Sequence, residues 1–246
     1  MKRPRKHGRF SGPRQPRPSR EIAVLYEDDA VIAIDKPAGL PAVPVAKNSK
    51  APSAWSVVAA ELRANRQRAF VVHRIDRFTS GVMLFAKNER DRDTLVRQFL
   101  AHTPVREYTA VVRGHLAKEE GTLVHHLRKE GQLQKLSSQR DKDAARAELH
   151  YQVERKLRDA TLVRVRLVTG LQNQIRVQFS AIGHPVIGDR KYHPGEADEK
   201  RIDRVALHAT KLEFAHPRTG NPVTVECPTP EDMNALERKL TPRHLS

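Results

Sequence analysis

Cysteine, long apolar runs and acidic residues near the N-terminus are scarce in this 246-residue chain. Cys227 is the only cysteine, which excludes a disulfide framework and a thiolate-based zinc site and fits a reducing compartment. No segment approaches the ~18 apolar residues that a membrane span requires, and the N-terminus lacks the apolar stretch of a secretory signal. We therefore expect a cytoplasmic protein that does not span a membrane. Because the chain also lacks an amphipathic basic helix, we expect no membrane partner.

Basic residues, by contrast, are abundant. The chain has 45 Lys and Arg against 29 Asp and Glu, a formal net charge of +16. Residues 1–20 contain eight of these cations, four prolines and no acid, so we expect a disordered basic arm there, followed by one domain over residues 21–246. A positive charge of this size favours a polyanionic partner such as RNA, DNA or an anionic membrane, although a solubility or localisation tail fits equally.

Hydrophobic patterns predict strands and helices in mixed order. The expected strands are 22–26, 31–35, 70–72, 81–86, 107–113, 147–154, 161–168, 205–214 and 222–227. The expected helices are 53–64, 88–101, 172–181 and 230–240. The polar stretch 128–146 is interpreted as an excursion from the core. Because neighbouring strands are joined mostly by turns, the pattern indicates an α+β fold on a mixed, largely antiparallel sheet.

Several chemistries lack their sequence motifs. There is no G-x-x-x-x-G-K-[ST] phosphate loop, no G-x-G-x-x-G turn and no H-E-x-x-H pair. His125-His126 is more typical of a solvated pair than of a metal site, because no further ligand stands at a suitable spacing. We therefore expect neither a cofactor nor a metal ion.

The segment 71–87, VVHRIDRFTSGVMLFAK, is the strongest candidate for a functional loop. It places Asp76 between Arg74 and Arg77, just before a buried strand, and rigid strands often hold catalytic loops. A second candidate, Asn173-Gln174-Ile175-Arg176, stands at the start of a predicted helix. From spacing alone, Asp76 fits both a catalytic carboxylate and a surface turn acid that pairs with a neighbouring arginine.

Residues 73–88, HRIDRFTSGVMLFAKN, resemble the HRLD-x-x-TSG signature of the RluA-type pseudouridine synthases, which isomerise uridine to pseudouridine in folded RNA. Further blocks occur in the family's order: DKPAGLP at 35–41, REYTAVVRG at 106–114, NQIRVQFSAIGHPVIGD at 173–189 and LHATKLEFAHPRTGNP at 207–222. The resemblance extends from about Ile22 to Pro228. It implies a monomeric isomerase with one catalytic domain that needs no cofactor and acts on ribosomal RNA or tRNA.

The resemblance also implies roles for four residues. Asp76 matches the family's nucleophilic aspartate, and Arg176 matches the arginine that pairs with it. Tyr108 matches the tyrosine that stacks on the target base and is a candidate for the final proton removal, and Arg74 matches the arginine that replaces the flipped base in the RNA. These roles make physical sense, because a guanidinium stabilises a nearby carboxylate and a planar cation with an aromatic ring offsets the cost of base flipping.

Two positions depart from the family pattern. Ile75 replaces the usual leucine, which conserves volume. Gly170-Leu171-Gln172-Asn173 stands where the family commonly has Gly-Arg-Thr-His before Gln-Ile-Arg. This second departure motivates an alternative: a catalytically impaired RNA-binding or ribosome-assembly factor on the same fold.

Basic residues outside these blocks are candidates for RNA contacts. Many relatives carry an S4-like RNA-binding domain, which twenty residues cannot encode, so we expect the basic arm to substitute for it through phosphate contacts. We also expect the segments 128–146 and 189–204 to flank the RNA, although a solvated charged surface fits each residue equally. The donors are Arg128, Lys129, Lys135, Arg140, Arg190, Lys191 and Arg201.

Overall fold

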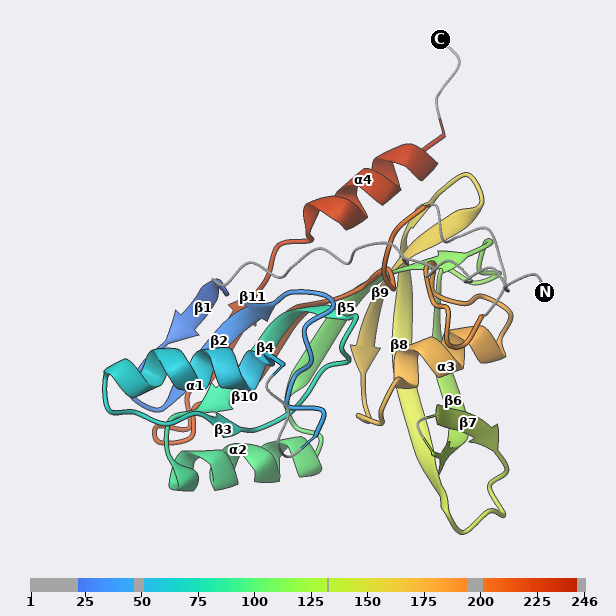
Figure 1. Cartoon of the computed structure of the whole chain (residues 1–246). Coiled ribbons are helices and arrows are strands. Elements are labelled where there is room, and N and C mark those ends of the chain that lie inside the picture. Colours follow the sequence, from blue (N-terminus) through green and yellow to red (C-terminus); the bar gives the residue numbers. More distant parts are fainter. Residues whose placement is uncertain (1–21, 47–50, 132, 194–200, 243–246) are drawn as a thin grey trace, which may run out of the picture.

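One open sheet organises the protein, as the computed structural model in Figure 1 shows. The structure describes residues 22–46, 51–131, 133–193 and 201–242, so the predicted arm at 1–20 lies outside the described residues. No helix within these ranges is long and apolar enough to cross a membrane. The expected α+β fold on a mixed, largely antiparallel sheet is confirmed.

Eleven strands form the sheet, in the order β1-β2-β4-β10-β5-β9-β8-β6-β7, with β11 beside β10 and β3 beside β4. The strands are β1 (Val24–Glu27), β2 (Val31–Lys36), β3 (Phe70–Val71), β4 (Ser80–Ala86), β5 (Val105–Arg113), β6 (Glu120–Glu130), β7 (Leu133–Ser137), β8 (Ala144–Lys156), β9 (Ala160–Leu167), β10 (Leu207–Ala215) and β11 (Pro222–Glu226). Among these described strands, β4 and β10 form the parallel pair and the other pairs are antiparallel.

Strand β4 is buried on both faces because two helices cover it. Val82 and Leu84 pack in the same cluster as Leu95 of α2 (Glu89–Leu100). Met83 and Phe85, which point to the opposite face, pack in the same cluster as Val58 of α1 (Ala54–Ala64). This double cover explains the continuous apolar run of β4, and it gives the loop before the strand a rigid base.

The largest core cluster lies in the other half of the sheet. It joins β5 and β9 to Phe179 of α3 (Gln174–Ala181) and Leu236 of α4 (Glu231–Leu240). Figure 1 shows α3 beside β6 and β8, well apart from α1 and α2. Helix α3 and the loop that precedes β4 meet at the centre of the sheet, because Ile75 of that loop packs in the same cluster as Ile175 of α3.

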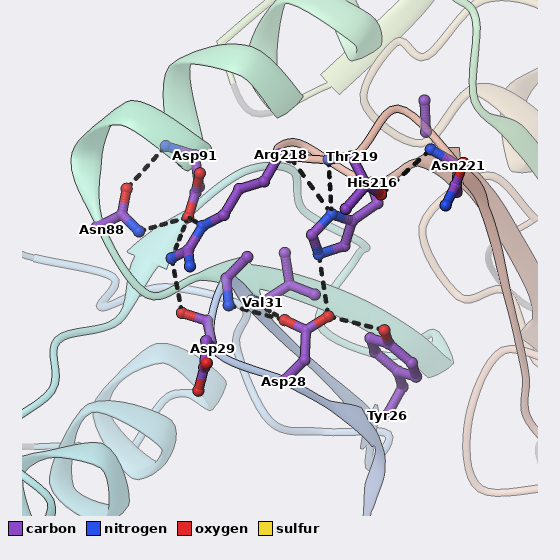
Figure 2. Close-up of polar contacts among 12 residues, drawn as sticks. Tyr26, Asp28, Asp29, Val31, Asn88, Asp91, His216, Arg218, Thr219 and Asn221 are labelled. Atoms are coloured by element: carbon purple, nitrogen blue, oxygen red, sulfur yellow. Dashed lines mark hydrogen bonds and ion pairs between the residues drawn. The ribbon is translucent and has the colours of Figure 1, made fainter.

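A polar cluster joins the β1–β2 turn, the β10–β11 turn and the start of α2 (Figure 2). Arg218, in the β10–β11 turn, donates to the buried Asp91 of α2 at 2.9 Å and to the Asp29 carbonyl at 2.9 Å. His216 lies 3.1 Å from Asp28, which also accepts from the Tyr26 hydroxyl at 2.7 Å. The cluster holds the β10–β11 turn against the start of α2.

Candidate active site

Asp76 lies in the loop that joins β3 to β4. The Ile75 side chain is buried in the largest core cluster, whereas the Asp76 side chain is 19% exposed. The Thr79 amide donates to the Asp76 carbonyl at 3.1 Å and closes a turn. The loop is therefore anchored on both sides of Asp76, and the carboxylate keeps access to solvent.

A buried lysine connects this loop to the segment after β2. Lys36 Nζ donates to the carbonyls of Leu40 at 2.9 Å and Arg77 at 3.2 Å, and the Gly39 amide donates to the Arg77 carbonyl at 2.8 Å. Burial lowers the pKa of Lys36 to about 7, although the nearby Asp76 charge acts in the opposite direction. Gly39 adopts φ 87°, a backbone conformation that favours glycine, to make this approach. Lys36 thus fixes the backbone beside Asp76.

Arg176 faces Asp76 from the first turn of α3. Its Nη1 lies 3.6 Å from Asp76 Oδ2, which makes an ion pair but exceeds a normal hydrogen-bond length. Its Nε and Nη2 each donate to the fully buried Asp189 at 2.7 Å. Burial acts to lower the pKa of Arg176, but the Asp189 carboxylate outweighs that effect and the pKa is raised. The guanidinium is therefore charged and rigidly held, with one edge turned toward Asp76.

Tyr108 is buried in the middle of β5, in the same core cluster as Ile75. Burial raises the pKa of Tyr108 to about 12, and the Asp76 charge acts in the same direction while Arg106 opposes it. The phenol therefore keeps its proton at neutral pH.

Arg74 is exposed, two residues before Asp76, and makes no hydrogen bond or ion pair with another residue in the described part of the chain. Three of the expected RNA contacts form ion pairs within the protein: Arg128 with Asp141, Lys135 with Glu130 and Arg201 with Asp159. The structure thus brings Asp76, Tyr108 and Arg176 into one region and leaves Arg74 at its surface.

The turn at residues 170–173, which departs from the family pattern, contacts Arg176 and holds it in place. Asn173 adopts the left-handed φ of 54°, and its Oδ1 accepts from Arg176 Nη1 at 2.8 Å. Leu171 packs against a small cluster that includes Leu127. Gln174 accepts from the Leu171 amide at 2.9 Å and closes the turn. The altered turn therefore supports Arg176 and does not displace it.

Sequence reasoning did not single out Lys36 or Asp189 as parts of the site, and it placed Asn173 in the second candidate without predicting its contact with Arg176. Lys36 and Asp189 both stand in the blocks that resemble the family, DKPAGLP and VIGD, so a signal was present. For Asp189, the functional meaning depends on a contact with Arg176 across 13 residues, which spacing alone does not specify.

A model of the RNA pseudouridylate synthase family matches residues 30–181 of the chain. The fold is similar to human RNA pseudouridylate synthase domain containing 4, with a TM-score of 0.76 over 89% of this chain and 92% of that one, at 21% identity.

Relatives in bacteria are more similar in sequence. The chain is 36% identical over 226 residues to the uncharacterized RNA pseudouridine synthase YlyB of Bacillus subtilis, covering 89% of this chain and 73% of that protein. It is 38% identical over 234 residues to ribosomal large subunit pseudouridine synthase D of Xanthomonas campestris, covering 89% and 69%. It is 34% identical over 201 residues to the dual-specificity RNA pseudouridine synthase RluA of Vibrio parahaemolyticus, covering 80% and 78%. The chain belongs to the RNA pseudouridylate synthase family, whose members are isomerases.

Proposed function

We propose that this enzyme isomerises uridine to pseudouridine in structured ribosomal RNA or tRNA, with Asp76 as the nucleophile. The observation that carries the proposal is the position of Arg176, whose Nη1 lies 3.6 Å from Asp76 Oδ2 while Asp189 holds the rest of the guanidinium. A fixed cation favours the ionised carboxylate that a nucleophile must present.

The separation between Asp76 and Arg176 suits a nucleophile. At 3.6 Å the guanidinium stabilises the charge without a close hydrogen bond, so the carboxylate oxygens are free to attack the uridine. In the proposed reaction, this attack allows the bond between the base and the ribose to break. The base then turns and rejoins the ribose through C5. C5 loses its proton, N1 takes up a proton, and the bond to Asp76 breaks, so that Asp76 is released unchanged.

Tyr108 and Arg74 are proposed to hold the RNA during this reaction. A buried aromatic ring beside Asp76 is suited to stack on the flipped uracil. Because its raised pKa keeps the phenol protonated, stacking is better supported for Tyr108 than direct removal of the final proton. Arg74 is exposed and free of described protein partners, as a side chain that enters the RNA stack must be.

The names of the relatives favour ribosomal RNA as the substrate. The relative from Xanthomonas campestris is named for the large ribosomal subunit, and the one from Vibrio parahaemolyticus is named as dual-specificity. The cytoplasmic location, the monomeric state and the division into an arm at 1–20 and a domain at 21–246 stay predictions.

The proposal is tested by mapping the product. The purified protein and its Asp76→Ala variant are incubated with unmodified ribosomal RNA and tRNA, and pseudouridine is located by carbodiimide-dependent primer-extension stops. New stops with the unaltered protein alone are expected, and they identify the target nucleotide.

Stops made equally by Asp76→Ala would remove the nucleophile assignment. An absence of stops, together with tight RNA binding by both proteins, would instead favour the RNA-binding or assembly factor. The support that Asn173 gives Arg176 argues for the enzyme, because the departure that motivates the alternative leaves the proposed site intact.

A further inference from the structure

Three arginines in the described part of the chain are buried, and one of them has no acidic partner. Arg176 and Arg204 each donate two hydrogen bonds to one aspartate, Asp189 and Asp232. Arg106 is 8% exposed, yet its hydrogen bonding within the described residues is limited to Nη2, which donates to the Val168 carbonyl at 3.1 Å. Arg106 Nε is enclosed and unpartnered. Because burying an unpaired charge is costly, a counter-charge is expected from outside the described residues.

Arg106 stands beside the proposed active site. It lies two residues before Tyr108 on β5, so the two side chains share one face of the strand. Val168, whose carbonyl it contacts, begins the turn that leads to α3 and Arg176. On the other side, the Arg106 charge adds to burial in lowering the pKa of His73, in the Asp76 loop. The guanidinium therefore lies between the nucleophile loop and the turn before α3.

The turn leaves room for one edge of this guanidinium. A Cβ at Gly170 would stand 2.3 Å from Arg106 Nη1, so any other residue there would displace it. The backbone of Gly170 does not adopt a positive φ, so space rather than conformation requires glycine. Nη1 has no hydrogen-bond partner among the described residues and, unlike Nε, is not fully enclosed. One donor edge is thus left available beside the site.

We propose that Arg106 binds a backbone phosphate of the RNA, with Nη1 as the principal donor. This inference rests on the proposed RNA substrate and adds a contact that positions it. A guanidinium is suited to phosphate because its charge is permanent and its donors are planar. The phosphate would supply the missing counter-charge between the Asp76 loop and the turn before α3.

The first test separates a phosphate contact from a structural role. Arg106→Met keeps the apolar stem and removes the charge, so the unbound protein is expected to keep or gain thermal stability. Its affinity for a short oligouridylate is expected to fall about tenfold, and the salt dependence of binding is expected to lose about one unit of slope. The control is Arg238→Met, which removes the same charge from the exposed face of α4 and is expected to change affinity less than twofold. An Arg106→Met protein that loses stability but keeps the affinity and the salt slope would overturn the inference.

The second test observes the side chain directly. Arginine Nε–H signals of the full-length protein are recorded by NMR, and Arg106 is assigned by its loss in the Arg106→Met spectrum. An oligouridylate with ordinary phosphodiester linkages is expected to shift the Arg106 signal, whereas the same sequence with uncharged methylphosphonate linkages is expected to shift it far less.

The outcomes distinguish this inference from the proposed function. Equal shifts with both oligonucleotides, or a shift of Arg74 without one of Arg106, would overturn the phosphate contact while RNA binding stands. Titrations in which no arginine signal moves would also overturn the phosphate contact, whereas the proposed function is contradicted separately, by an absence of pseudouridine in ribosomal RNA and tRNA.

Discussion

Replacing Asp189 by asparagine tests whether the buried partner of Arg176 serves catalysis as well as stability. Asp189 is fully buried and accepts from Arg176 Nε and Nη2 at 2.7 Å and from the amides of Lys191 at 3.0 Å and Tyr192 at 3.1 Å. Breaking a buried pair of this kind costs about 3–5 kcal/mol of unfolding free energy. Because Nη1 would no longer be aimed at Asp76, we also expect kcat to fall about a hundredfold, as for a misplacement of about 1 Å.

The matched control is Asp232→Asn. Asp232 binds Arg204 through the same two nitrogens, at 2.6 and 2.7 Å, but its side chain is 47% exposed and lies at the start of α4. Its loss should cost about 1–3 kcal/mol, because Arg204 is buried although the Asp232 carboxylate is half exposed, and kcat should not change. Urea unfolding gives the stabilities, and single-turnover pseudouridine formation at saturating RNA gives the rates. If Asp189→Asn kept the kcat of Asp232→Asn, Arg176 would not need its anchor and the reasoning would be refuted.

Two further predictions concern stability. Arg218→Ala should lower the unfolding free energy by about 1–3 kcal/mol, since it leaves the buried Asp91 without its guanidinium (Figure 2), and should leave turnover unchanged; unaltered thermal unfolding would contradict this. Burial, with a smaller effect of Arg106, lowers the pKa of His73 to about 3, so only the unfolded chain binds this proton between about pH 6.5 and 3. The unfolding free energy should therefore decrease as the pH is lowered through that window, by up to about 1.4 kcal/mol per pH unit. Urea titrations should show a shallower dependence of stability on pH for His73→Gln than for the unaltered protein. Equal dependences would refute the lowered pKa of His73.

The elements that pack on the core were predictable from the sequence. The apolar run at 81–86 becomes β4, covered on both faces, and Asn88 caps α2 as expected, its side chain accepting from the Asp91 amide. The prediction missed β6, because Glu120–Glu130 is half exposed and carries few apolar residues. The polar stretch 128–146 was interpreted only as an excursion from the core, and no strand was predicted in it, although it contains β7 and the ends of two further strands. Backbone pairing in this hairpin, rather than burial, specifies those strands.

In the candidate site, too, some residues were predictable from the sequence and the contacts that hold them were not. Asp76 and Arg176 were found because each stands in a motif, and the structure places them together. The contacts that hold Arg176 could not be predicted, because Asn173 reaches it only through a left-handed backbone conformation. The available edge of Arg106 depends on the space left at Gly170, which only the folded turn reveals.

The most direct test of the nucleophile assignment is the turnover of Asp76→Asn, which keeps the shape of the side chain and removes its charge. At saturating RNA, the variant is expected to make no detectable pseudouridine, while its RNA affinity stays within a few-fold of the unaltered protein and its thermal unfolding is unchanged. Measurable turnover by this folded, RNA-binding variant would contradict the assignment of Asp76 as the nucleophile.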